Sequence, residues 1–381
     1  MKIYQVGGSL RDELLGQTVV DRDWVVVGAT PGQMVEAGFK PVGRDFPVFL
    51  HPTTHDEYAL ARTERKTAPG YRGFTFHAAP EVTLEEDLAR RDFTVNAIAR
   101  QVQPPIDDAP LIDPYRGADD LKHRVLRHIG PAFAEDPVRI LRGARFVARF
   151  GFTVAPETMA MMRAMVAAGE VDALVPERVW QEIARGMMER DPRAMFALLD
   201  RAGALARVAP ELAPWQEDSA ATRALGAAAL ANLPLPQRVA ALCSELASDA
   251  LLRLCEHLKV PADCRDLAVI YVRHRAELRQ ASTLDAARLA ELVRATDGLR
   301  QPERFGGLIA TAAVCAAGAG VTYASAGQRL RLALAAVRGI DAGAIAQQVA
   351  SPAAIQQALR SARETAVAAA LAGMVAAGPP A

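Results

Sequence analysis

Residues 6–27 read VGGSLRDELLGQTVVDRDWVVV, and in this stretch a glycine pair and an acidic triplet lie between short apolar runs. The pattern predicts a strand that turns at Gly7–Gly8 into a helix ended by Gly16. A second strand, Trp24–Val27, is predicted directly after the acidic triplet Asp21-Arg22-Asp23. The chain therefore opens with a compact unit of strands and one short helix.

Outward from this stretch, the composition changes at about residue 125. Before it, β-rich runs such as residues 23–27 and 46–50 alternate with turn residues. After it, apolar residues recur at helical spacing, with prolines as punctuation. The fold class predicted is α+β: a mixed-sheet head followed by an all-helical remainder that ends in an alanine-rich tail.

Size and charge narrow the class of protein. The chain has 381 residues, of which 51% are hydrophobic, and its formal net charge is zero. This is ordinary globular composition for two or more domains, and no apolar run reaches the length of a membrane span, so we expect a cytoplasmic protein without a membrane partner. A net charge of zero does not indicate a nucleic-acid binder, so any contact with RNA must come from local basic patches.

The four cysteines, Cys243, Cys255, Cys264 and Cys315, are scattered without paired spacing. Neither a zinc site nor a disulfide framework is indicated, and we expect buried or free thiols.

The glycine turn can hold a triphosphate. Glycine lets the backbone approach closely, the start of a helix offers free N–H groups, and Arg11 adds a positive charge. A tight turn followed by a surface arginine is the alternative.

The acidic triplet is the second chemical signal. Residues two apart in an extended chain project from one face, so Asp21 and Asp23 would point to one place. Mg²⁺ favours a few carboxylates together with phosphate oxygens, and it is the natural counter-charge here. The alternative is a polar turn before a strand.

Two further motifs combine arginines with carboxylates. In Arg90-Arg91-Asp92-Phe93-Thr94-Val95-Asn96, Arg91 could grip a phosphate or ribose, and the alternative is a capped helix start with local salt bridges. In EDPVRILR, residues 135–142, helical spacing would align Asp136, Arg139 and Arg142 along one side, and an i to i+3 salt bridge is the alternative.

Base chemistry gives the second motif a sharper interpretation. Cytosine and adenine present an exocyclic amine beside a ring-nitrogen acceptor, whereas uracil and guanine present a carbonyl beside an N–H. A fixed carboxylate beside a guanidinium matches the first pair and repels the second. Asp136 and Arg139 could thus select CTP and ATP without a nucleic-acid template.

Six segments in this order resemble the class II tRNA nucleotidyltransferase and poly(A) polymerase family. The sequence is similar to the bacterial CCA-adding members, densely from Met1 to about Met188 and faintly afterwards. The segments are GGSLRDELLG (7–16), DRDW (21–24), RRDFTVNA (90–97), IDPYRGADDL (112–121), EDPVRILRGARF (135–146) and PERVWQEI (176–183).

The resemblance implies a fold and a division of the chain. It implies a nucleotidyltransferase head of the polymerase-beta type at residues 1–125, a helical neck at 126–190 that recognises the base, a helical body at 191–280, and a tail at 281–381 with possible tRNA contact.

The resemblance also implies site residues. Asp21 and Asp23 match the catalytic, metal-binding carboxylates, for which Mg²⁺ is the expected cofactor. The nucleotide-binding residues that match are Gly8, Arg11, Arg91, Asp136, Arg139 and Arg142. The loop Lys66–Phe76 aligns with a mobile segment that the family uses in switching from C to A addition.

The expected function is template-independent addition and repair of the 3′-terminal CCA of tRNA from CTP and ATP, with release of pyrophosphate. No protein partner is implied. A poly(A) polymerase shares the head motifs, and enzymes that add only CC or only A are variants. A non-catalytic RNA-binding module is the alternative from another class, but it would gain only phosphate repulsion from Asp21 and Asp23.

One departure from some bacterial relatives concerns a phosphohydrolase domain marked by a helical His-Asp pair. The comparable residues 238–245 read RVAALCSE, without that pair, and only His257 and His274 lie beyond residue 130. We expect the form that lacks this domain, without phosphatase or phosphodiesterase activity.

Overall fold

The computed structural model describes residues 1–19, 22–42, 48–66, 74–102, 109–349 and 351–376. Contacts within the chain define two compact units. Unit 1 comprises Met1–Ile183 and Ala194–Val208, and unit 2 comprises Ala184–Arg193 and Ala209–Ala381.

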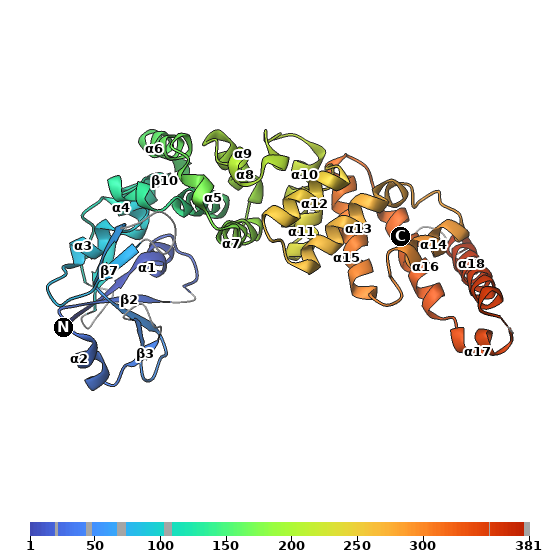
Figure 1. The fold of residues 1–381 in the computed structure, drawn as a ribbon, viewed down its shortest axis with the longest axis horizontal. Helices are drawn as coiled ribbons and strands as arrows, with labels where there is room; N and C mark the ends of the chain where they lie inside the picture. Colours follow the sequence, from blue (N-terminus) through green and yellow to red (C-terminus); the bar gives the residue numbers. More distant parts are fainter. Residues whose placement is uncertain (20–21, 43–47, 67–73, 103–108, 350, 377–381) are drawn as a thin grey trace. The chain divides into compact units, whose positions relative to one another are not determined.

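Unit 1 is built on a mixed seven-stranded sheet in the order β3-β4-β5-β2-β1-β8-β9 (Figure 1). Its β2 and β5 are parallel, whereas the other neighbours are antiparallel. The strands are β1 (Lys2–Val6), β2 (Asp23–Val27), β3 (Lys40–Val42), β4 (Val48–Leu50), β5 (Glu57–Leu60), β8 (Ala99–Gln101) and β9 (Leu111–Ile112). The predicted mixed-sheet head is confirmed.

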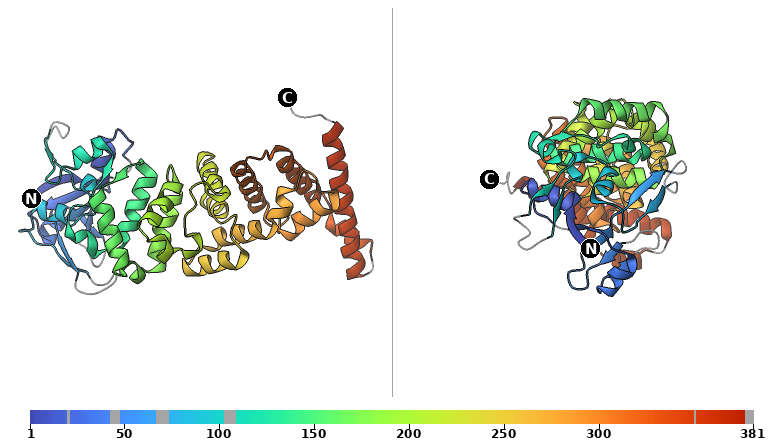
Figure 2. Two further views of the ribbon diagram at one scale, coloured as in Figure 1. Left: turned by 90° about the horizontal axis from the view of Figure 1, so that it is seen from above. Right: turned by 90° about the vertical axis from the view of Figure 1, so that its left-hand side faces the viewer.

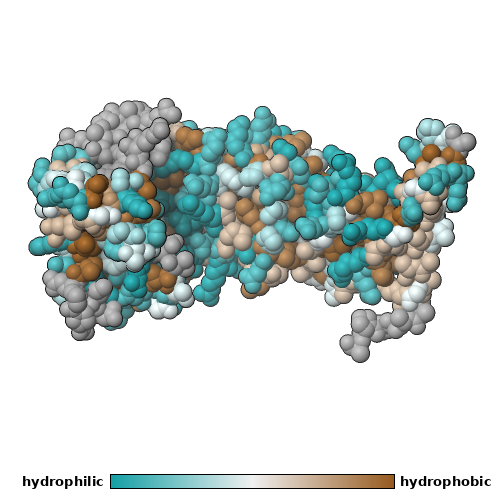
Figure 3. Space-filling model, turned by 90° about the horizontal axis from the view of Figure 1, so that it is seen from below, coloured by the Kyte–Doolittle hydropathy of each residue, from teal (hydrophilic) through white to brown (hydrophobic). Residues whose placement is uncertain are grey.

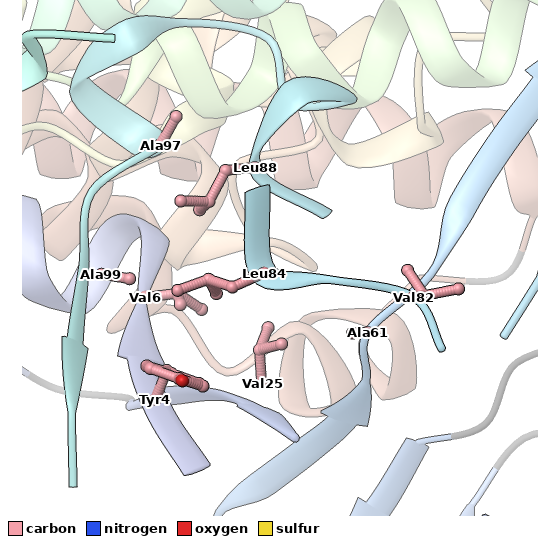
Figure 4. Close-up of a cluster of buried hydrophobic side chains, with 9 residues drawn as sticks. All are labelled: Tyr4, Val6, Val25, Ala61, Val82, Leu84, Leu88, Ala97 and Ala99. Atoms are coloured by element: carbon pink, nitrogen blue, oxygen red, sulfur yellow. The ribbon is translucent and has the colours of Figure 1, made fainter. Parts of the chain in front are cut away.

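Alternation along β2 divides the core between the two faces of the sheet. Val25 points to the face where it joins Tyr4, Val6 and residues of α3 (Leu84–Ala89), in the cluster that Figure 4 shows. Trp24 points to the other face and stacks on Tyr58, with ring centroids 5.5 Å apart. Since the side-chain period of a strand is two, Asp23 projects toward the same face as Val25.

Helices and short strands complete unit 1. The remaining strands are β6 (Thr63–Lys66), β7 (Phe74–His77), β10 (Val125–Leu126) and β11 (Thr153–Val154). The α-helices are α1 (Gly7–Leu14), α2 (Pro31–Glu36), α3, α4 (Gly117–His123), α5 (Val138–Phe150), α6 (Pro156–Ala167), α7 (Pro176–Met187), α8 (Pro192–Arg201) and α9 (Leu205–Val208), of which α7 and α8 each extend into unit 2. Short 3₁₀ helices lie at η2 (Thr94–Asn96), η4 (Pro131–Glu135) and η5 (Glu170–Ala173).

Unit 2 is helical over its described residues, as predicted. After η6 (Pro210–Leu212) it contains α10 (Ala220–Leu230), α11 (Leu235–Leu242), α12 (Ser248–His257), α13 (Ala262–Arg279), α14 (Ala286–Ala295), α15 (Pro302–Gly318), α16 (Ala324–Arg338), α17 (Ala342–Gln347) and α18 (Pro352–Ala376). Helix α15 packs against α10, α11 and α13, and α18 packs against α14 and α16 (Figure 2).

Small residues allow close packing in unit 2. At Gly318, a Cβ atom would lie 2.7 Å from the carbonyl oxygen of Ala220, so any side chain there would push α15 away from α10. All four cysteines are buried and free, as expected. Among the described residues, no three His, Cys, Asp or Glu side chains are grouped as a metal would require.

The surface of the described residues is mixed. Figure 3 shows hydrophilic residues over much of one face, with smaller apolar patches between them. Within the described ranges, the structure contains no helix long and apolar enough to cross a lipid bilayer.

Candidate active site

The site begins with the register of three strands. Val6, the last residue of β1, pairs with Asp23 at the start of β2, and Asp23 pairs with Glu57 at the start of β5. Helix α1 follows Val6 directly, as the glycine motif predicted. The register therefore brings the glycine turn and two carboxylate residues to one edge of the sheet.

Gly7 is required at this edge for two reasons. Its φ of +70° lies in the left-handed region that favours glycine. A Cβ atom at this position would also lie 2.9 Å from the Nη1 atom of Arg91 and 3.5 Å from Oδ2 of Asp23. The turn thus leaves room for a guanidinium and a carboxylate to approach the start of α1.

Arg11 is buried, with 4% of its surface exposed, rather than on the surface. Its Nη1 donates to Oδ1 of Asn96 at 2.6 Å, and its Nε donates to Oδ1 of Asp12 at 2.8 Å. The guanidinium lies over the rings of Phe146 and Phe150, 5.1 and 4.7 Å from their centroids. Burial lowers the pKa of Arg11. The alternative of a surface arginine is wrong.

Arg91 is oriented by a buried carboxylate. Oδ2 of Asp87 accepts from Nη2 of Arg91 at 3.0 Å, and Oδ1 accepts from Nη2 of Arg90 at 2.7 Å. Asp87 has no exposed surface. Burial alone raises its pKa, but the charges of Arg91 and Arg90 hold the pKa of Asp87 below its ordinary value.

Asp92 joins the head to helix α5. Its Oδ2 accepts from Nε of Arg142 at 2.8 Å, and its Oδ1 accepts from Nδ2 of Asn96 at 2.8 Å. Burial alone would raise the pKa of Asp92. The charge of Arg142 and the hydrogen bond from Asn96 outweigh burial, so the pKa of Asp92 lies below its ordinary value. The alternative for the segment Arg90–Asn96 is half right. The 3₁₀ helix η2 begins within it at Thr94 without a side-chain cap, whereas local salt bridges are present between Asp87 and both Arg90 and Arg91.

The structure corrects the predicted position of Asp136. Helix α5 begins at Val138, and Asp136 precedes it in extended backbone. Pro137 has no N–H to donate, and Oδ1 of Asp136 accepts instead from the N–H of Val138 at 3.1 Å. Asp136 therefore caps the helix rather than lying along its side with Arg139 and Arg142.

Arg139 binds the backbone of the head. Its Nη2 donates to the carbonyl of Arg90 at 2.6 Å, and its Nη1 donates to the carbonyl of Ala132 at 2.9 Å. Together with the pair between Arg142 and Asp92, these bonds tie the first two turns of α5 to residues 90–92.

These side chains surround one pocket of about 610 Å³ within unit 1. Nine arginines line it against four carboxylates, a formal excess of five positive charges. The arginines are Arg11, Arg62, Arg90, Arg91, Arg139, Arg142, Arg145, Arg149 and Arg178, and the carboxylates are Asp23, Glu57, Asp92 and Asp136. Such a pocket suits a polyanion.

Seven of the eight predicted site residues lie around this pocket. They are Gly8, Arg11, Asp23, Arg91, Asp136, Arg139 and Arg142. Asp21 lies outside the described residues, as do residues 67–73 of the loop Lys66–Phe76.

Sequence reasoning missed Glu57 and Asp87. It named Glu177, Arg178 and Glu182 as residues that could brace the base-reading helix through salt bridges, and the pairs Arg178–Asp136 and Arg145–Glu182 confirm this for Arg178 and Glu182. Both β2 and β5 begin with an acid before an apolar run, DWVVV and EYAL, which could have indicated Glu57. Asp87 lies four residues before Arg91, a spacing at which side chains meet on a helix. The sequence carries no signal that Arg178 faces Asp136.

Comparisons with known proteins identify the family of this chain. The model of the poly A polymerase head domain matches residues 3–127, and that of the probable RNA and SrmB-binding site of polymerase A matches residues 151–216. The multifunctional CCA protein of Burkholderia multivorans is 52% identical over 97% of this chain and 99% of its own length.

Solved structures share the fold. The Bacillus stearothermophilus CCA-adding enzyme in complex with CTP is 25% identical, with a TM-score of 0.71 over 96% of this chain and 88% of that one. A CCA-adding enzyme with ATP is 19% identical, with a TM-score of 0.72 over 96% of this chain and 86% of that one.

The chain belongs to the class II tRNA nucleotidyltransferase and poly(A) polymerase family, in its branch of bacterial CCA-adding enzymes. It is therefore an enzyme that transfers nucleotides, as the motifs of the head predicted.

Proposed function

We propose that this enzyme builds and repairs the 3′-terminal CCA of tRNA from CTP and ATP, without a nucleic-acid template. The observation that carries the proposal is a single pocket that contains the sheet-edge carboxylate Asp23, the glycine turn with its arginines, and the acceptor Asp136. The pocket thus combines groups for phosphoryl transfer with a group that can read a base.

The edge of the sheet suits Mg²⁺. Asp23 is exposed at the mouth of the glycine turn, and Glu57 is its partner in the parallel register, so oxygen ligands of the kind that Mg²⁺ prefers lie beside a site for phosphates. We assign Asp23 and Asp21 as the catalytic pair that holds the metal. When bound, the metal would acidify the attacking 3′-hydroxyl and neutralise phosphate charge.

The chain's own residues would hold the triphosphate. Gly8 offers backbone N–H at the start of α1, and Arg91, fixed by Asp87, directs positive charge to the same place. Arg11 lies below the turn, where its Nη2 would be 3.4 Å from a Cβ on Gly8. These contacts would stabilise the pyrophosphate as the RNA 3′-oxygen displaces it from the α-phosphorus.

Base choice would fall to the neck. Oδ2 of Asp136 can accept the exocyclic amine of cytosine or adenine, and we assign Arg139 as the donor beside it and Arg142 as a further nucleotide-binding residue. Both arginines also hold α5 against residues 90–92. The carbonyl that uracil or guanine presents would meet a carboxylate and be repelled.

A division of labour along the chain extends the same proposal. A head at 1–125, a neck at 126–190, a body at 191–280 and a tail at 281–381 would divide catalysis, base reading and tRNA contact. Because tRNA is the substrate, we place the enzyme in the cytoplasm, and we expect no phosphatase or phosphodiesterase activity.

The test uses a tRNA that lacks its last three nucleotides, incubated with the purified protein and Mg²⁺. Each nucleoside triphosphate is supplied alone, and CTP and ATP are supplied together. Growth by two with CTP and by three with the pair is expected, and a chelator should abolish both. A long A ladder would instead indicate a poly(A) polymerase, and no growth would leave an RNA-binding protein.

A further inference from the structure

Arg178 contacts the acceptor of the base-reading site from a separate helix. It lies in the first turn of α7, and its Nη2 donates to Oδ2 of Asp136 at 3.3 Å. The side chains are 26% and 20% exposed, and both line the pocket. A nucleobase placed against Asp136 would therefore meet Arg178 as well.

The two oxygens of Asp136 have different tasks. Oδ1 accepts from the N–H of Val138 at the start of α5, and this single bond anchors only one end of the carboxylate. Oδ2 faces Arg178. The exocyclic amine of a base would accordingly be accepted at the oxygen that Arg178 already orients.

Arg139 and Arg142, the α5 arginines of the predicted base-reading motif, also bind residues other than Asp136. Arg139 donates to the carbonyls of Arg90 and Ala132, and Arg142 donates to Asp92. Arg178 on α7 forms an ion pair with Asp136.

We infer that Arg178 is a specificity-determining residue for nucleotide choice. It fixes the acceptor oxygen of Asp136 and supplies a donor beside it, so that the pair matches an amine next to a ring nitrogen. Without Arg178, Asp136 can rotate, and the repulsion of uracil and guanine weakens. This inference rests on the proposed function.

A second ion pair also connects α7 to α5, so its removal is a matched control for a purely structural role of Arg178. Nε of Arg145 on α5 donates to Oε2 of Glu182 on α7 at 2.7 Å, and the two side chains are 11% and 7% exposed. Loss of this pair would loosen the same two helices without removing a contact to Asp136.

The experiment compares Arg178→Gln, Arg178→Lys, Asp136→Ala and Glu182→Gln in the full chain. The kcat/KM of single additions is measured for CTP and UTP on tRNA that lacks CCA, and for ATP and GTP on tRNA that ends in CC. Loss of one charged hydrogen bond predicts about a tenfold or larger fall in the CTP:UTP and ATP:GTP ratios for Arg178→Gln and Asp136→Ala. Arg178→Lys keeps the charge without the planar fork, so a smaller fall is expected.

Glu182→Gln should lower all four rates together and leave the ratios unchanged. The inference is overturned if Arg178→Gln leaves the ratios intact, or if Glu182→Gln shifts them equally. If Arg178→Gln does not fold, unchanged ratios in Arg178→Lys together with altered ratios in Asp136→Ala overturn it. A wild-type protein that adds neither C nor A overturns the proposed function itself.

Discussion

The ion pairs beside the pocket of unit 1 contain buried carboxylates, whereas exposed ion pairs lie on the helices of unit 2. In unit 1, Asp87 and Asp92 have side-chain exposures of 0% and 6% and each meets an arginine at the pocket. In unit 2, the pair between Arg253 and Asp249 is 61% and 70% exposed, and that between Arg294 and Glu291 is 61% and 35% exposed. Exposed pairs contribute little to stability, whereas buried ones carry a desolvation cost.

This difference in burial shows that the chain uses buried carboxylates to orient arginine side chains at the pocket. In unit 1, the buried carboxylates of Asp87 and Asp92 hold Arg91 and Arg142 in fixed orientations at the pocket, although burying these carboxylates carries a desolvation cost. In unit 2, helices are held by small and apolar contacts such as Gly318 against α10, and its exposed pairs are peripheral. Substitutions of carboxylates in the two units should therefore have very different consequences.

The largest effect on activity is expected at Asp23. Asp23→Asn removes a metal ligand in the proposed site, and nucleotide addition should fall by about 10³-fold or more. The residue is exposed, so the unfolding midpoint in urea should stay near that of the wild type. Single-nucleotide addition of CTP measures the effect, with Asp249→Asn as the control. A folded Asp23→Asn protein of normal activity would remove Asp23 from the catalytic pair.

The largest effect on stability is expected at Asp92. Asp92→Asn leaves Arg142 without its charged partner, and the free energy of unfolding of unit 1 should fall by about 1–3 kcal/mol, because Arg142 is 36% exposed and water solvates part of its charge. Trp24 and Trp180 lie in unit 1 and Trp215 in unit 2, so urea titrations of single-tryptophan variants report on each unit. A change confined to the Trp215 signal would contradict the assignment.

Acid should weaken unit 1 through the same carboxylates. The folded pKa of Asp87 and of Asp92 lies below the ordinary value, so the unfolded chain takes up protons first as the pH falls. Their contribution is present above about pH 4 and is lost as the pH falls through the folded pKa. The stability difference between the wild type and Asp92→Asn should therefore narrow as the pH falls below about 4. Parallel curves in urea titrations would refute this linkage.

The smallest effect is expected for an exposed pair. Asp249→Asn in α12 removes the exposed partner of Arg253 and should leave the free energy of unfolding close to that of the wild type. Urea unfolding followed by Trp215 fluorescence measures it. A loss as large as that of Asp92→Asn would erase the contrast between the units.

Local patterns predicted the fold well. The strand at Val6, the glycine turn and the strand Trp24–Val27 follow from alternation and turn residues within a few positions, and the structure confirms them. The helical remainder follows equally from periodicity and proline positions. These features depend on neighbours in sequence.

Features that depend on strand register or on packing between helices could not be predicted. The pairing of Asp23 with Glu57 requires the strand order, and the contact of Arg178 with Asp136 requires the packing of α7 near the start of α5. The start of α5 was predicted too early because the spacing in EDPVRILR fits a helix, whereas Pro137 lets Asp136 cap it from outside.

The capping role of Asp136 has an evolutionary consequence. A change to alanine would lose the helix cap together with base reading, so selection would meet two defects at once. Asp136→Asn would keep a cap while offering an amide that both donates and accepts. Substitutions that keep a capping residue at position 136 would therefore separate the loss of base reading from the loss of the helix start.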